Sequence, residues 1–136
     1  MAKPANSSRR GSRGRSGGAS QLYAALDLGT NNCRLLIAEP TRAGGLRVVD
    51  SFSQIVTLGE GLANSGHLSE QAMGRAIEAL RKCSDKVKKH RPVQTRYIAT
   101  QACRQAANGK AFLNEVHRKI GLRMETITPK EEAKYA

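Results

Sequence analysis

The sequence is organised around residues 24–38, which read AALDLGTNNCRLLIA. Two apolar runs flank a short polar segment, so each run is typical of a buried strand and the segment between them of a tight turn. Gly29 permits a positive φ or the close approach of an anion. Hydroxyl, side-chain amide and backbone N–H donors come from Thr30, Asn31 and Asn32. We therefore predict a phosphate-binding turn at residues 29–32.

Asp27 lies two residues before Gly29 and can hold a hydrated cation or a water molecule there. The alternative is an ordinary β-hairpin turn with an aspartate beside it. Short D-x-G-T patterns arise often by chance, so these residues alone leave both interpretations open.

The length of 136 residues and the apolar fraction of 39% are typical of one soluble globular domain with a real core. The basic, Gly- and Ser-rich residues 1–21 cannot bury enough apolar surface to fold, so we expect a disordered tail followed by one folded unit, residues 22–136. The tail has no apolar core of a secretory signal, and no later segment reaches transmembrane length. We expect a cytoplasmic protein with no membrane contact.

The net charge of +12 divides into +5 in the tail and +7 in residues 22–136. A basic folded unit suits a polyanionic ligand, because positive potential raises the local concentration of phosphate-rich molecules, and nucleic acid would be served equally well. The tail has Arg and Gly but no aromatic residue on which bases could stack, so any RNA contact there would be electrostatic. We expect a solvated tail rather than a nucleic-acid contact.

The three cysteines, Cys33, Cys83 and Cys103, lie far apart and lack C-x-x-C spacing, which argues against a zinc ribbon or a disulfide scaffold. We interpret them as buried reduced thiols. The three histidines show no ligand spacing either.

Periodicity predicts strands at residues 23–28, 33–39, 46–56, 96–100 and 124–127. A helix begins after the N-cap Ser69, a short helix covers residues 102–107, another ends near Ile120, and a last one begins at Pro129. Residues 59–63 are expected to form a loop. The order βββαβαβ, followed by a helix, predicts an α/β fold with a mixed five-stranded sheet on which the helices pack. Polar residues follow strands near residues 27–32, 100–104 and 130–132, so we expect them to converge at one crevice.

Three further segments resemble the exopolyphosphatase and guanosine pentaphosphatase (Ppx/GppA) family: LGEGL at residues 58–62, ATQACRQAAN at 99–108 and ITPKEEA at 127–133. With D-L-G-T at residues 27–30, they occur in order and at suitable spacing throughout residues 22–136. The resemblance implies the ribonuclease H-like first lobe of the actin-like ATPase superfamily. It also implies an Mg²⁺-dependent enzyme that releases the terminal phosphate of polyphosphate or of pppGpp.

Carried over residue by residue, the resemblance makes Asp27, Gly29, Thr30, Asn31 and Asn32 the first phosphate loop, with Asp27 holding the metal through water. It makes Arg104 a phosphate ligand and Glu132 the catalytic carboxylate. The residues alone permit a surface role for Arg104 and a first-turn helix role for Glu131 and Glu132. Arg34 faces either the phosphate or solvent, and Asn108 is interpreted as a helix cap.

The sequence departs from the family pattern at Thr30 and Asn32, where many members carry serine. Both replacements keep a side chain that can form hydrogen bonds. The glycine-rich second phosphate loop and the second lobe are missing from these residues, so we expect a truncated lobe with weak activity or none. The sequence does not choose between polyphosphate and pppGpp, nor fix the oligomeric state, a homodimer of the full-length protein included. The alternatives are an ATP-dependent sugar or acetate kinase-like lobe and a basic RNA-associated module.

Overall fold

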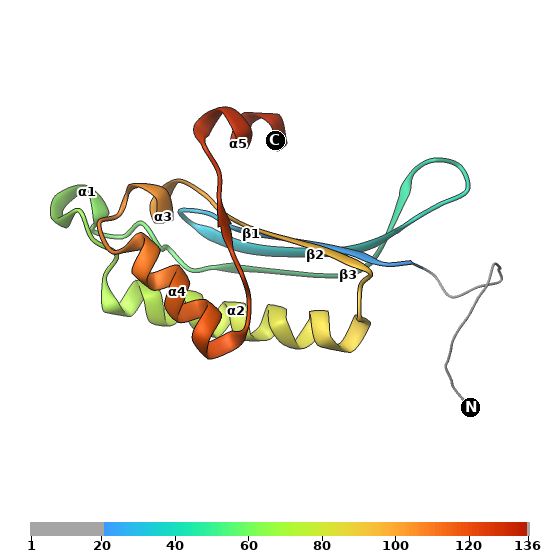
Figure 1. Ribbon diagram of the computed structural model, residues 1–136, viewed down its shortest axis with the longest axis horizontal. Helices are drawn as coiled ribbons and strands as arrows, with labels where there is room; N and C mark the ends of the chain where they lie inside the picture. The colour runs from blue at the N-terminus through green and yellow to red at the C-terminus, as the bar shows by residue number, and fades with distance from the viewer. Residues whose placement is uncertain (1–20, 136) are drawn as a thin grey trace.

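The computed structural model describes residues 21–135, without the side chains of Glu132 and Tyr135 (Figure 1). The predicted tail, residues 1–21, lies outside the described residues except for Gln21. The strands are β1 (Tyr23–Leu28), β2 (Asn32–Pro40), β3 (Leu46–Ile55), β4 (Gln94–Ala99) and β5 (Glu125–Thr126). The helices are α1 (Leu62–Ser65), α2 (Glu70–His90), α3 (Gln101–Gln105), α4 (Gly109–Ile120) and α5 (Pro129–Tyr135).

The five strands form one mixed sheet in the order β3-β2-β1-β4-β5. The first three strands meander antiparallel because short turns connect them, whereas β1, β4 and β5 are parallel. β3 runs in the same direction as β1, because β1, β2 and β3 alternate in direction. The long crossover through α2 brings the chain back so that β4 also runs in this direction, and β4 therefore pairs parallel with β1. The predicted α/β fold with a mixed five-stranded sheet is confirmed.

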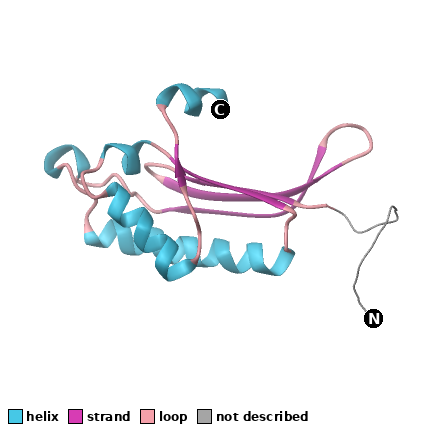
Figure 2. Ribbon diagram, in the orientation of Figure 1, coloured by secondary structure: helices cyan, strands magenta, loops and turns pink. Residues whose placement is uncertain are grey.

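One face of the sheet carries α2 and α4, and α5 lies on the opposite side (Figures 1 and 2). In β1, Ala24, Leu26 and Leu28 are buried, while the alternate residues, Asp27 among them, are exposed. This period-2 alternation follows from the pleat, which sends successive side chains to opposite faces. The core therefore lies between the sheet and the helical layer, and Asp27 belongs to the other face.

The two long helices begin as the sequence suggests, with one difference. The Ser69 side chain accepts a hydrogen bond from the Ala72 amide, which confirms the predicted N-cap of α2. Asn108 occupies the N-cap position of α4, but its side chain makes no capping bond. Instead its amide group binds both the N–H (2.8 Å) and the carbonyl oxygen (3.0 Å) of Leu68. Asn108 thus ties the start of α4 to the segment before α2.

The loop expected at residues 59–63 is wrong in part, because α1 begins at Leu62. This single turn of helix is bounded by Gly61 and Gly66, whose φ values of 77° and 76° lie in the left-handed region. Four residues cannot display an amphipathic period, so the pattern in the sequence carried no sign of α1.

The cysteines are all buried, as predicted. Cys33 on β2 and Cys83 on α2 face each other with their Sγ atoms 3.8 Å apart. Burial raises the pKa of the Cys103 thiol to about 12, so this thiol stays protonated and unreactive at neutral pH. Within the described residues, no helix is both long and apolar enough to cross a membrane.

Asp50 on β3 joins the sheet to the last turns of α2. Its carboxylate accepts bonds from His90 Nε2 at 3.0 Å and from Lys86 Nζ at 3.1 Å. These partners, His90 first and Lys86 second, lower the pKa of Asp50 to about 2. A carboxyl whose pKa is depressed by folding stabilises the fold above its unfolded pKa and loses that contribution as the pH falls through its folded value.

We therefore expect Asp50→Asn to lower the urea midpoint at neutral pH, and the difference from the wild type to shrink as the pH falls from about 4 to about 2. The matched control is Asp85→Asn, on the exposed side of α2, which should leave the midpoint unchanged. If the difference in urea midpoint between Asp50→Asn and the wild type were still undiminished at about pH 2, this would contradict a lowered pKa of Asp50 in the folded state.

Candidate functional site

The 29–32 turn lies at the carboxyl end of β1, where it leads into β2. The Gly29 amide donates to the Asn32 carbonyl oxygen at 2.9 Å, which closes the turn. The Gly29 N–H is thus used within the turn. The amides of Thr30 and Asn31 donate to no other group among the described residues. Backbone donors without a partner are costly unless water or an anion binds them, so these two N–H groups can bind an anion.

A second loop, residues 56–60, binds the carbonyl oxygens of this turn. The amides of Val56 and Thr57 donate to the Asn31 carbonyl oxygen at 2.8 and 3.0 Å, and the Gly59 amide donates to the Thr30 carbonyl oxygen at 3.0 Å. A trans peptide directs its N–H opposite to the preceding carbonyl, so the Asn31 N–H points away from Gly59. The 56–60 loop therefore fixes the direction in which the turn presents its donors.

Gly59 allows this close approach because it has no side chain. A Cβ atom at this position would lie 2.5 Å from the Thr30 Cγ2 atom, well inside van der Waals contact. The LGEGL segment was noticed for its resemblance alone, and its support of the turn was not predicted. A glycine in the loop that follows a strand is the signal that could have indicated a close backbone approach.

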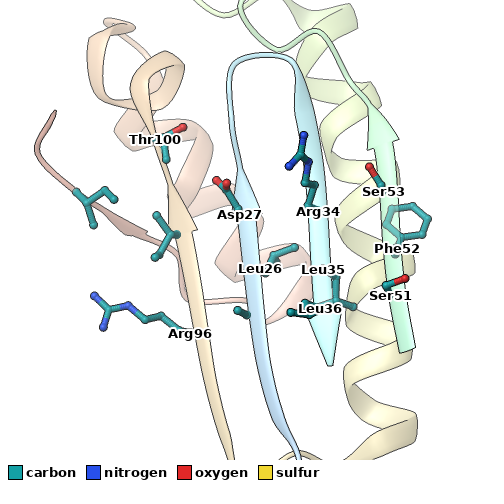
Figure 3. Close-up of a pocket in the computed structure, with 13 residues that line it drawn as sticks. Leu26, Asp27, Arg34, Leu35, Leu36, Ser51, Phe52, Ser53, Arg96 and Thr100 are labelled. Carbon is teal, nitrogen blue, oxygen red and sulfur yellow. The ribbon is translucent and has the colours of Figure 1, made fainter. Parts of the chain in front are cut away.

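Asp27 lines a cavity of about 670 Å³ on the sheet face that α2 and α4 leave uncovered (Figure 3). In the antiparallel register Asp27 lies directly opposite Arg34 on β2, and both side chains are exposed. Arg34 thus lies on the same face as Asp27 and lines the same cavity. Thr100, at the end of β4, closes one side of the cavity, and its amide donates to the Leu28 carbonyl oxygen at 3.1 Å.

Arg104 on α3 lines a different, smaller cavity of about 350 Å³, together with Lys110. Its Nη1 donates to the carbonyl oxygen of Ile127, and Ile127 also lines the cavity of Asp27. Arg104 and Asp27 therefore do not share one hollow, and Ile127 lies between them. The expected convergence holds for Asp27 and Thr100, and the guanidinium of Arg104 contacts the segment that leads into α5.

The start of α5 is a capping box formed by Thr128 and Glu131. The Glu131 carboxylate accepts from the Thr128 amide at 2.9 Å, and the Glu131 amide donates to Thr128 Oγ1 at 3.1 Å. The backbone hydrogen bond from Thr128 is the main reason that the pKa of Glu131 is lowered. Glu131 is therefore a capping residue, in agreement with a first-turn helix role, and the T-x-x-E spacing could have predicted the cap.

Glu132 belongs to α5, but its side chain lies outside what the structure describes. Its assignment as the catalytic carboxylate stays a prediction. Capping fixes the first turn of α5, because it satisfies helix-terminal donors that would otherwise lack partners.

The described residues contain no group of three or more His, Cys, Asp or Glu side chains that could hold a metal. Mg²⁺ does not need such a cluster, because it is usually bound through one or two carboxylates together with water and substrate phosphate oxygens. Asp27, exposed beside the turn, fits that role.

The five-stranded open sheet and its helices define an α/β lobe of the actin-like ATPase type. Residues 36–136 match the model of the Ppx/GppA phosphatase family, so the chain belongs to that family.

The solved structures that resemble this chain include members of the same family. A Ppx/GppA family member from Aquifex aeolicus is 30% identical over 87% of this chain and 38% of its own, with a TM-score of 0.81. An exopolyphosphatase-like protein is 32% identical over 84% of this chain and 34% of its own, with a TM-score of 0.76. An exopolyphosphatase from Cytophaga hutchinsonii is 26% identical over 84% of this chain and 36% of its own, with a TM-score of 0.78. The chain thus spans little more than a third of these relatives.

Proposed function

We propose that this chain supplies the first phosphate-binding lobe of a phosphoanhydride hydrolase, which releases the terminal phosphate of inorganic polyphosphate or of pppGpp. The observation that carries the proposal is the 29–32 turn at the end of β1 in a Ppx/GppA family chain. Two of its backbone N–H groups have no acceptor within residues 21–135. The similarity to exopolyphosphatase structures supports the same reaction class.

In this proposal the turn binds the oxygens of one phosphate through the amides of Thr30 and Asn31 and through the Thr30 hydroxyl. During phosphoryl transfer, negative charge spreads over the non-bridging oxygens. Donors that the fold already holds in place stabilise this charge, because they do not have to move during the reaction. Arg104 lines the adjacent cavity rather than that of Asp27, so in this proposal its guanidinium would bind a phosphate farther along the chain.

Glu132 acts on the attacking water. Its carboxylate orients the water in line with the bond to be broken and accepts its proton, while the water oxygen bonds to the terminal phosphorus. The bridging P–O bond then breaks, orthophosphate leaves, and the remaining chain is one phosphate shorter. The capped start of α5 would hold Glu132 at a fixed place.

Mg²⁺, held by Asp27 through water and by phosphate oxygens, would neutralise phosphate charge when bound. The sequence supplies the matching order of groups: a carboxylate at position 27 and donors three and four residues later. Asp27 would therefore anchor the ligand's cation, while the turn anchors its oxygens.

The test is phosphate release by a protein of the relatives' full length that carries this lobe. With Mg²⁺ present, we expect orthophosphate from polyphosphate or from pppGpp without added ATP. Phosphate transfer that requires ATP and a sugar or acetate acceptor would instead favour a kinase and contradict the proposal. Comparing the two substrates at equal concentration identifies which of them is hydrolysed.

A further inference from the structure

Arg75, on α2, contacts the 56–60 loop at three points. Its Nε donates to the Val56 carbonyl oxygen at 2.8 Å, and its Nη2 donates to the Thr57 carbonyl oxygen at 3.2 Å. The same Nη2 lies 2.6 Å from Glu60 Oε1. A guanidinium is planar and holds its donors in a rigid fork, so these bonds fix the loop in orientation as well as in distance.

Two of the residues that Arg75 holds, Val56 and Thr57, also hold the turn. Val56 and Thr57 donate their amides to the Asn31 carbonyl oxygen, and Gly59 donates to the Thr30 carbonyl oxygen. Arg75 is therefore two hydrogen bonds away from the carbonyl group of Asn31, the residue whose N–H is one of the turn's donors. Among the described residues, no other side chain binds the carbonyl oxygens of both Val56 and Thr57.

Thr57 shows why the loop needs such support. Its φ of 48° lies in the left-handed region, which is strained for a β-branched residue. A strained conformation persists only where its surroundings hold it, and here the Thr57 amide and carbonyl are bound by Asn31 and by Arg75 respectively.

We propose that Arg75 is a positioning residue for the 29–32 turn, acting through the 56–60 loop and without contact with the ligand. The positioning claim concerns the turn itself, and only its consequence for phosphate binding rests on the proposed function. Without Arg75, Thr57 relaxes, the bonds to Asn31 weaken, and the turn's donors no longer converge.

The first test is amide hydrogen exchange of this chain, which needs no ligand. In Arg75→Gln we expect the amides of Val56, Thr57 and Gly59 to exchange faster by about tenfold, because each lost charge-assisted bond loosens the loop. The control Arg81→Gln removes the same charge from the exposed side of α2 and should leave these three rates unchanged. Unchanged exchange in a folded Arg75→Gln would overturn the proposal.

The second test measures affinity for tripolyphosphate by titration of backbone amide shifts. Arg75→Lys keeps the charge but loses the fork, and it guards against misfolding of the glutamine variant. We expect both variants at position 75 to bind about tenfold more weakly, and Arg81→Gln to bind like the wild type. Wild-type affinity in Arg75→Lys would show that the charge alone acts, and would overturn the proposal. A wild-type chain that does not bind tripolyphosphate would contradict the proposed function, while the exchange rates still decide the positioning role.

Discussion

Replacing Gly109 by alanine is expected to destabilise the fold by about 1–3 kcal/mol or more. Gly109 is the buried first residue of α4, and a Cβ atom there would lie 1.9 Å from the carbonyl oxygen and 2.8 Å from the carbonyl carbon of Cys103. Both are backbone atoms, so no side-chain rotation can relieve the clash. The connection between α3 and α4 would have to move, which would disturb the segment that carries Arg104.

Urea unfolding of Gly109→Ala measures this effect, and Gly74→Ala is its matched control. Gly74 lies within α2, where a Cβ atom would meet no other atom within 4 Å. Alanine at that position should stabilise the chain by about 0.5–1 kcal/mol, because glycine loses more backbone entropy in a helix. A Gly109→Ala variant as stable as the wild type would show that α3 and α4 approach each other differently.

The largest expected effect on activity is that of Glu132→Gln in the full-length enzyme. Glutamine keeps the size of the side chain but cannot accept a proton, so we expect the rate of phosphate release to fall about 10²–10⁴-fold. The KM should change little, because in the proposal Glu132 acts on the water rather than on the phosphate chain.

Glu131→Gln provides the control one residue earlier. Its amide oxygen can still accept the bond from the Thr128 amide, so the capping box and the turnover should both survive. Near-wild-type turnover in Glu132→Gln would remove Glu132 from catalysis. Equal losses in both variants would instead indicate that α5 is simply destabilised.

The sequence predicted the elements whose signals are local. The alternation in residues 23–28 and the Ser69 cap each depend on a few neighbouring residues, and both are found as expected. The parallel pairing of β1 and β4 was also predictable, because a long helix between two strands leaves little other choice. By contrast α1 is too short to display a helical period, so no local pattern predicted it.

The candidate site was predictable only in part, and for a physical reason. The 29–32 turn is contiguous in sequence, so its glycine and its polar residues were visible together. The bonds from Arg75 to Val56, from Asn108 to Leu68 and from Arg104 to Ile127 join residues separated by 19 to 40 positions. Contacts over such separations depend on how the elements pack, and no local pattern encodes them. How the elements pack also decides that Asp27 and Arg104 line separate cavities, so the sequence did not predict this separation.

The central claim is that the 29–32 turn is an anion site rather than an ordinary hairpin turn. The most direct measurement is the map of backbone amide shifts as tripolyphosphate is added to this chain in the presence of Mg²⁺. We predict saturable shifts that are largest at Thr30 and Asn31, the two amides that donate to no group in the described part of the chain. Shifts confined to the lysines and arginines of α2, with those two amides unmoved, would contradict the account.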